Sequence, residues 1–332
     1  MRVAVLFNAP ALPPDHPDFA SEADVVEVAS AVIQALVDAG HEAWPVAAKP
    51  PLGSLVASLD QRPPDVVFNL IEGFGGSSGG EAHITGLLEL LGLPYTGCPP
   101  EAQGLCRSKA RAKAVLRGSG LPTAPAAVAR VGGAPIDWEG PFPAIAKPES
   151  EDASLGIDQR SVAGSADELR RAVARLHDRY GSDVLIEAYL PGREFNIGVI
   201  ELGEPSALPV AEIVYKVPTG DWPILTYAAK WHAGSDEDLA SPPVCPAPVD
   251  EALAGRLSGL AVDAFRATGC RDYARVDVRL DAEGRPMILE VNPNPDIGPT
   301  AGWARALRAS GRAYGATLAA LAEQAGRRGG HG

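Results

Sequence analysis

The segment RVDVRLDAEGRPMILEVNPNPD, residues 275–296, constrains the fold most, because apolar and charged residues alternate on both sides of a turn-like DAEG sequence. Such alternation is typical of strands, and Asp and Gly favour a tight turn, so the segment predicts a hairpin. Symmetry about the turn pairs Arg275 with Glu290 and Asp277 with Ile288. Since successive side chains of a strand point to opposite faces, one face is charged and the other faces a core.

The charged face is predicted to carry Arg275, Asp277, Arg279, Ile288, Glu290 and Asn292, and the core face Val276, Val278, Leu289 and Val291. Hard divalent cations prefer oxygen ligands, and Mg²⁺ commonly uses one or two carboxylates together with substrate phosphates. Asp277, Glu290 and Asn292 therefore form a candidate Mg²⁺ site. The hairpin by itself is also compatible with a solvated strand face that holds ion pairs.

The remainder of the chain divides into three predicted segments. Strand patterns at 3–7, 42–46 and 65–70 alternate with helical patterns at 22–39 and 81–92, which favours a parallel α/β domain over residues 1–97. A central lobe, 98–190, is predicted from a helix at 108–118, strands at 142–148 and 183–190, and a helix begun by a Ser165/Glu168 capping box. A C-terminal lobe, 191–332, is predicted from strands at 194–200 and 208–214, a helix at 252–268, the hairpin and a helical tail.

Composition excludes several classes of function. The formal net charge of −13 argues against general binding to nucleic acid or anionic membranes. No apolar run approaches the ~18 residues that span a bilayer, and the N-terminal run is too short for a signal peptide. The four cysteines lack C-x-x-C spacing, so they are predicted to be free thiols of a cytoplasmic protein.

Two charged residues interrupt apolar strand patterns. Lys147 follows the apolar residues 144–146, and Glu187 follows 184–186. A buried lysine needs an anionic partner, so both residues are candidates for a binding site. The Gly-rich loop 73–80 has neither the lysine of a P-loop nor the spacing of a dinucleotide fingerprint, so it does not itself indicate nucleotide binding.

Several segments in order resemble the ATP-grasp superfamily and, within it, the D-alanine–D-alanine ligase family: EGFGG, LLELLGLPYTG, SKARAKAVLRGSGLPTAP, IAKP, VLIEAYLPGREF, YAAKW, ARVDVRLD and EVNPNPD. The resemblance covers nearly the whole chain. It implies an α/β fold of the ATP-grasp type with an N-terminal parallel α/β domain, a small central α+β lobe and a C-terminal lobe built on an antiparallel sheet. ATP is expected between the last two lobes.

The resemblance also implies roles for individual residues. Those expected to bind ATP are Lys109, Lys147, Glu187, the backbone of Ala188 and Leu190, Glu194 and Lys230. Asp277, Glu290 and Asn292 match the ligands of two Mg²⁺ ions, which Mn²⁺ can replace, and Arg275 matches the arginine that steadies the reacting acyl group. The loop 152–156, with Ser154, resembles the family's phosphate cover, and residues 217–238 are expected to be a mobile lid too irregular to pack as an element.

The substrate side departs from the family's pattern. Glu72 replaces a histidine, Trp231 replaces a tyrosine after Lys230, and Ala301 replaces a serine that holds a carboxylate. The remaining substrate candidates are Glu22, for an amino group, and Asp296.

The function implied is an ATP-dependent carboxylate–amine ligase that acts on small amino-acid-like substrates through an acyl-phosphate. The family is usually dimeric, so a homodimer is expected. The alternatives are a housekeeping D-alanine–D-alanine ligase, a carboxylate kinase and a non-catalytic ATP-binding module.

Overall fold

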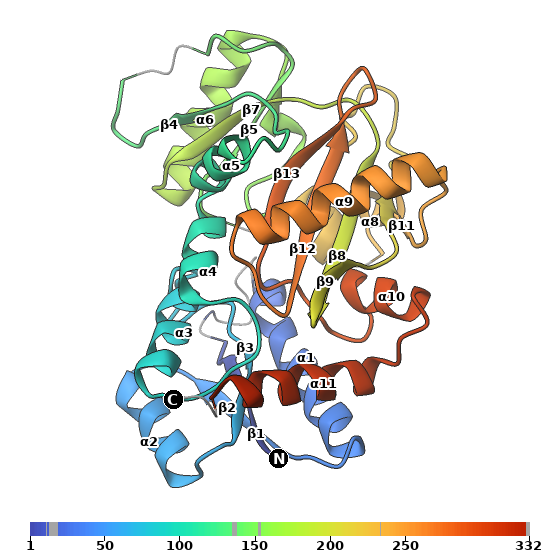
Figure 1. The fold of residues 1–332 in the computed structure, drawn as a ribbon. Coiled ribbons are helices and arrows are strands. Elements are labelled where there is room, and N and C mark those ends of the chain that lie inside the picture. Colours follow the sequence, from blue (N-terminus) through green and yellow to red (C-terminus); the bar gives the residue numbers. More distant parts are fainter. Residues whose placement is uncertain (11, 13–18, 135–137, 152–153, 233, 330–332) are drawn as a thin grey trace.

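The computed structural model describes residues 1–10, 12, 19–134, 138–151, 154–232 and 234–329, and it omits the side chains of residues 20–22. Three sheets organise the chain, one parallel and two antiparallel (Figure 1). The predicted α/β fold class is therefore confirmed. All four cysteines are free, as the sequence predicts.

The N-terminal sheet is parallel, with strand order β2-β1-β3. Its elements are β1 (Arg2–Asn8), α1 (Phe19–Asp38), β2 (Glu42–Ala48), α2 (Leu52–Gln61), β3 (Val66–Leu70) and α3 (Gly80–Leu90). Helices cover both faces, which explains why β1 is an uninterrupted apolar run. The sequence predicts no element at 52–61, yet Leu55 and Leu59 of α2 pack beneath this sheet.

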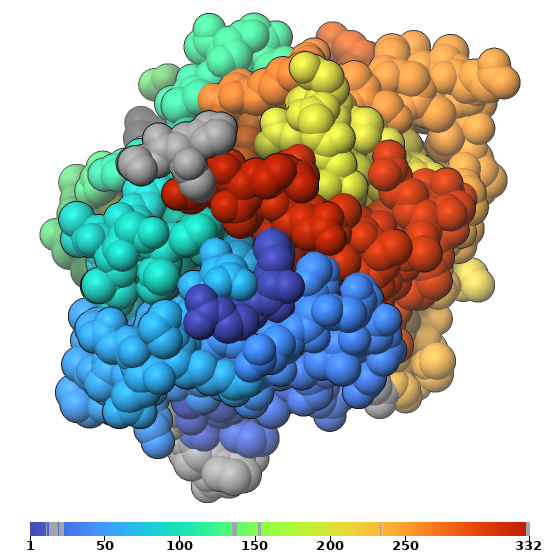
Figure 2. Space-filling view, turned by 60° about the horizontal axis from the view of Figure 1, so that its bottom comes forward, coloured from blue at the N-terminus to red at the C-terminus, as the bar shows by residue number. Residues whose placement is uncertain are grey.

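The last helix of the chain, α11 (Tyr314–Arg328), completes the N-terminal core. Leu318, Leu321 and Ala322 lie in one buried cluster with Val32 of α1 and Val5 of β1. Figure 2 shows the C-terminal helices, in red, seated against the blue N-terminal elements. Asp272 adds a second connection, because its carboxylate accepts from Arg328 Nη1 and Nη2, each at 2.7 Å. The boundaries at residues 97 and 190 remain predictions.

The central lobe packs one long helix against a sheet of order β4-β7-β5-β6. Its elements are α4 (Pro100–Arg107), α5 (Lys109–Gly118), β4 (Ala126–Ala129), β5 (Ala144–Pro148), a 3-10 turn (Gln159–Ser161), β6 (Val162–Ala163), α6 (Ala166–Tyr180) and β7 (Val184–Ala188). Ser165 caps α6 by accepting from the Glu168 N–H, as predicted, and Gly181 ends the helix with φ 60°. The predicted capping box is wrong in its other half, because the Glu168 carboxylate accepts from the Gly164 N–H at 2.7 Å and not from the Ser165 N–H. The sequence predicts no helix at α4.

The C-terminal lobe holds an antiparallel sheet of order β11-β10-β8-β12-β13, with β9 paired to β8. Its elements are β8 (Glu194–Leu202), β9 (Glu204–Ala207), β10 (Ala211–Ile213), β11 (Pro243–Val244), α9 (Glu251–Ala267), β12 (Tyr273–Leu280), β13 (Pro286–Asn292) and α10 (Gly302–Ala309). Helix α9 covers one face of this sheet, and the opposite face is turned toward the cleft (Figure 1).

The predicted register of the hairpin is wrong by two residues near its open end. Arg275 pairs with Asn292 and Asp277 with Glu290, while the next pair joins Val278 to Ile288. A β-bulge therefore leaves Leu289 without a partner on β12. Because of the extra residue, Ile288 is fully buried in the core and Leu289 lines the cleft, the reverse of the predicted faces.

The stretch predicted to be too irregular to pack contains two short helices, α7 (Tyr227–Trp231) and α8 (Asp236–Leu239). Thr226 and Ser235 supply their N-caps, a local signal within the Pro- and Gly-rich sequence. The lid, defined from here on as residues 217–232, is therefore partly regular.

Candidate active site

A cleft of about 640 Å³ lies between the central and C-terminal lobes. Of the predicted site residues, those that line it are Lys109, Lys147, Ser154, Glu187, Ala188, Leu190, Glu194, Lys230, Trp231, Arg275, Asp277, Glu290, Asn292 and Asp296. Glu72 is outside this lining, although its charge still acts on Lys230. The side chain of Glu22 and the residues Asp152 and Ala153 lie outside the described part of the chain.

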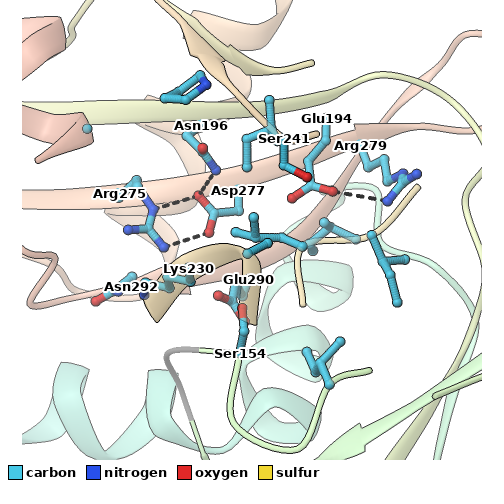
Figure 3. Close-up of a pocket in the computed structure, with 18 of the residues that line it drawn as sticks. Ser154, Glu194, Asn196, Lys230, Ser241, Arg275, Asp277, Arg279, Glu290 and Asn292 are labelled. Carbon is cyan, nitrogen blue, oxygen red and sulfur yellow. Dashed lines mark hydrogen bonds and ion pairs between the residues drawn. The ribbon is translucent and has the colours of Figure 1, made fainter. Parts of the chain in front are cut away.

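The charged face of the hairpin forms one wall of the cleft (Figure 3). Arg275 holds Asp277 through two bonds of 2.8 Å, from Nε to Oδ1 and from Nη2 to Oδ2. Asn196, on the neighbouring strand β8, donates to Asp277 Oδ1 at 2.7 Å. The bidentate contact fixes both side chains, so Asp277 and Arg275 enter the cleft as one preorganised unit.

Glu290 faces a group of cations. Lys109 Nζ lies 4.0 Å from Glu290 Oε2, and Lys147, Arg275 and Lys230 also act on this carboxylate. Burial alone would raise the pKa of Glu290, but these four cations lower it to about 2. The group is therefore an ionised oxygen donor at neutral pH.

The donor set of Asp277, Glu290 and Asn292 fits Mg²⁺. Asn292 Oδ1 accepts from the Asn294 N–H at 3.1 Å, which orients the amide at the end of β13. Within the described residues, no three His, Cys, Asp or Glu side chains gather as a metal site. Two carboxylates and an amide suit an ion that completes its shell with phosphate and water, and they do not suit a structural Zn²⁺ site.

The central lobe contributes a buried charge triad to the cleft: Lys113 on α5, Lys147 on β5 and Glu187 on β7. Lys147 Nζ is 2.5 Å from Glu187 Oε2, and Lys113 pairs with Glu187 Oε1. Burial favours neutral forms, which lowers the pKa of Lys113, whereas the two lysines outweigh burial and lower the pKa of Glu187. Sequence reasoning assigned no role to Lys113, although it lies one helical turn after Lys109 and so on the same face of α5.

A second ion pair lies further along the cleft. Arg279 Nη1 donates to Glu194 Oε2 at 3.0 Å, and the Tyr215 hydroxyl donates to the same oxygen at 2.9 Å. Burial raises the pKa of Glu194 although Arg279 opposes this shift. Arg279 was expected only as a member of the charged face, yet it is almost fully buried.

The lid lines the cleft on the other side, together with Ser154 and Leu155. Ser154 has φ 60°, a left-handed conformation that is uncommon for a residue with a Cβ. Part of the Lys230 side chain is exposed to water, but the cleft walls surround its ammonium group. The resulting desolvation, together with the charge of Arg275, lowers the pKa of Lys230. Its ammonium lies 5.1 Å from the ring centroid of Trp231. Both lid residues line the cleft that contains Glu290, and Figure 3 shows Lys230 beside this carboxylate.

Comparison with known proteins shows to which family this chain belongs. The family model described as D-ala D-ala ligase C-terminus matches residues 134–323. The D-alanine–D-alanine ligase of Gluconobacter oxydans is 34% identical over 272 residues, covering 81% of this chain and 84% of that protein. The chain belongs to the D-alanine–D-alanine ligase family. This confirms the resemblance stated above and identifies the protein as an ADP-forming ATP-grasp ligase that forms a carbon–nitrogen bond.

Other relatives of this ligase span similar lengths. An uncharacterised protein of Sinorhizobium fredii, y4sG, is 33% identical over 308 residues, covering 91% of this chain and 88% of that protein. The solved D-alanine–D-alanine ligase of Bacillus anthracis complexed with ATP has a TM-score of 0.77 at 20% identity, with 99% and 98% of the two chains covered. That likeness confirms the ATP-grasp fold. In the described part of the ligase, none of the helices has the length and apolarity needed to cross a membrane.

Proposed function

We propose that this ligase joins the carboxylate of one amino-acid-like substrate to the amine of another, through an acyl-phosphate and with Mg²⁺. The arrangement of cations around Glu290 carries the proposal. Lys109, Lys147, Lys230 and Arg275 all act on one carboxylate at the end of the cleft. Such a concentration of cations and acids suits bound triphosphate with metal ions.

The nucleotide would lie between the central sheet and the lid. Apolar side chains line this part of the cleft: Ile145, Leu155, Ile157, Tyr189, Ile213, Ile224, Leu225 and Leu289. The backbone of Ala188 and Leu190 would bind the edge of the base, and Glu194 would accept a sugar hydroxyl. Lys113 offsets the charge of Glu187, so Lys147 can direct part of its own charge to a phosphate.

The chemistry has two balanced steps. An oxygen of the donor carboxylate attacks the γ-phosphorus of ATP, the bond to the β-phosphate oxygen breaks, and ADP leaves. The acceptor amine then attacks the acyl carbon, phosphate leaves, and the amine loses a proton as the amide forms. Bound Mg²⁺ would supply charge neutralisation on the phosphates. Lys230 would orient the γ-phosphate, Arg275 would donate to the oxyanion, and Trp231 would exclude water from the acyl-phosphate.

The substrate pockets differ from those implied by the family's pattern. Ala301 is the N-cap of α10 without a side-chain hydrogen bond, so it offers no hydroxyl to a substrate carboxylate. Asp24, two residues after Glu22 on α1, lines the cleft, and the charge of Asp296 acts on it. We therefore propose Asp24 as an additional candidate, beside Asp296, for binding a substrate ammonium. The identity of the amino acids, a homodimer and a cytoplasmic location remain predictions.

The test is a screen of amino-acid pairs, D-alanine with D-alanine included, in which released ADP and amide product are both measured. The proposal expects stoichiometric ADP and amide for at least one pair. Efficient formation of D-alanyl-D-alanine would favour the housekeeping function. ADP with an acyl-phosphate that hydroxylamine traps, but no amide with any amine, would favour a carboxylate kinase. Nucleotide binding without turnover would favour the non-catalytic module, and Glu290→Gln provides the inactive control.

A further inference from the structure

Arg279 connects the nucleotide side of the cleft to the lid. Arg279 is only 4% exposed, and its side chain donates to three residues on two segments besides its own strand. Nη1 donates to Glu194 Oε2 at 3.0 Å, Nε donates to the Gly192 carbonyl at 3.1 Å, and Nη2 donates to the Pro223 carbonyl at 2.6 Å. Pro223 belongs to the lid, so one guanidinium binds both the backbone of the lid and Glu194, the residue proposed to accept a sugar hydroxyl of the nucleotide.

Aromatic rings hold this guanidinium in place. Its carbon lies 5.0 Å from the ring centroid of Tyr189 and 5.4 Å from that of Tyr215. Nη2 also donates to the Tyr189 hydroxyl at 3.1 Å. A planar group with several donors and two neighbouring rings has few alternative positions, so movement at one contact is transmitted to the others.

The lid is docked beside this contact. Trp222 and Gln159 exchange two hydrogen bonds, of 2.7 Å from the Trp222 N–H and 3.1 Å from Gln159 Nε2. The Trp222 ring meets Tyr189 edge-on, with centroids 5.2 Å apart, and the Tyr227 N–H donates to the Ile157 carbonyl at 3.1 Å. The lid therefore rests on the central lobe at Ile157, Gln159 and Tyr189.

The nucleotide pocket shares residues with this docking surface. Ile145, Ile157, Tyr189 and Ile224 line the cleft, and the same four belong to the small apolar cluster that includes Trp222. A base bound in the pocket would therefore contact side chains that also hold the lid. Arg279 and Tyr215 both donate to Oε2 of Glu194. Oε1 can therefore accept a hydroxyl of a ligand while the hydrogen bond from Arg279 to Oε2 is kept.

We propose that Arg279 is a positioning residue that couples occupancy of the nucleotide pocket to closure of the lid. Nucleotide fixes Glu194, Glu194 fixes the guanidinium, and the guanidinium fixes Pro223 and the lid that follows it. Coupling is reciprocal, so a closed lid tightens nucleotide binding by the same factor. The inference rests on the proposed function only in requiring that ATP binds in this cleft.

The test uses two variants and a matched control. Arg279→Met removes every donor while it retains most of the side-chain volume, and Arg279→Lys keeps the charge beside Glu194 without the planar fork. The control is Arg193→Met: Arg193 also binds one carboxylate through two bonds, to Glu212 at 2.6 Å each, and one carbonyl, that of Pro248. These Arg193 contacts do not involve the lid.

Hydrogen exchange at the Trp222 and Tyr227 amides, with and without a non-hydrolysable ATP analogue and Mg²⁺, measures closure directly. In wild type and Arg193→Met, the analogue should slow exchange at both amides. In Arg279→Met this protection should fall by about 10- to 100-fold at saturating analogue, the range expected for a lost charged hydrogen bond. Arg279→Lys should also lose the protection of the lid, and its analogue affinity, measured by calorimetry, should fall by a similar factor because the coupling is reciprocal.

Wild-type protection in either Arg279 variant at saturating analogue would overturn the proposal. If Arg279→Met does not fold, Arg279→Lys decides the question, because it retains the buried ion pair. The absence of analogue binding to the wild-type protein would instead contradict the ATP site itself, so the two failures are distinguishable.

Discussion

Replacing Glu187 with glutamine should destabilise the ligase more than replacing Lys113 with methionine. Lys113 and Glu187 are each 1% exposed, and Lys147 is 7% exposed. Glu187→Gln leaves two buried ammonium groups without their carboxylate, a change that costs about 3–5 kcal/mol of unfolding free energy. Lys113→Met leaves Glu187 paired with Lys147 at 2.5 Å, so its cost should be about 1–2 kcal/mol.

The difference should depend on pH in a defined direction. The pKa of Lys113 is already lowered by burial, and removal of its carboxylate partner lowers it further. Between that lowered pKa and the usual lysine value, the unfolded chain binds more protons than the folded one, so stability rises with pH. The destabilisation by Glu187→Gln should therefore be largest near pH 7 and smaller at about pH 9.5.

Urea unfolding of the wild type and both variants at the two pH values measures these free energies. Lys113→Met should show little recovery at high pH, because its remaining lysine keeps a carboxylate partner. Equal stability of the two variants at pH 7, or a Glu187→Gln deficit that persists unchanged at the higher pH, would refute the charge argument.

Three further outcomes are expected. Glu290→Gln should lower ADP release by at least about a hundredfold with unchanged thermal unfolding, since it removes an ionised oxygen from the proposed metal site; near-normal turnover would contradict that site. Lys147→Ala should weaken ATP binding by about 10- to 100-fold and adenosine binding far less, as measured by calorimetry, because it loses a phosphate contact. Trp231→Ala should consume ATP with little amide product, whereas Lys230→Ala should slow ADP and amide formation together; a wild-type ratio of ADP to amide in the tryptophan variant would exclude its role in keeping water out.

Local patterns predicted much of the architecture. Apolar spacing located α1 and α3 of the N-terminal domain but not α2, and Ser165 marked the start of α6. The argument that a charged residue in an apolar strand needs a partner was confirmed for Lys147 and Glu187, which bind each other. The helices, the helix cap and the two buried charges depend on residues that are close in sequence or belong to one strand, so they can be predicted from a single sequence.

Contacts between distant segments could not be predicted in the same way. The bulge at Leu289 follows from how β12 and β13 pair, and alternation of residue types gives no sign of an extra residue. Arg279 is buried because Tyr189 and Pro223, far away in sequence, enclose it. The sequence pattern predicts only that Arg279 is one more charged residue on the exposed face of a strand. Its contacts with the lid could be found only from the three-dimensional structure.

Helix α11 makes the folding of the N-terminal domain depend on a segment that is synthesised more than 200 residues later. When residues 1–97 leave the ribosome, the face formed by Val5, Val32 and their neighbours still lacks Leu318 and Leu321. Domains otherwise tend to fold in the order in which they emerge. Here the N-terminal segment must keep an apolar face uncovered until residues 314–328 have been synthesised, which makes this face a candidate for chaperone binding. A polypeptide that stops before residue 314 would present the same face permanently.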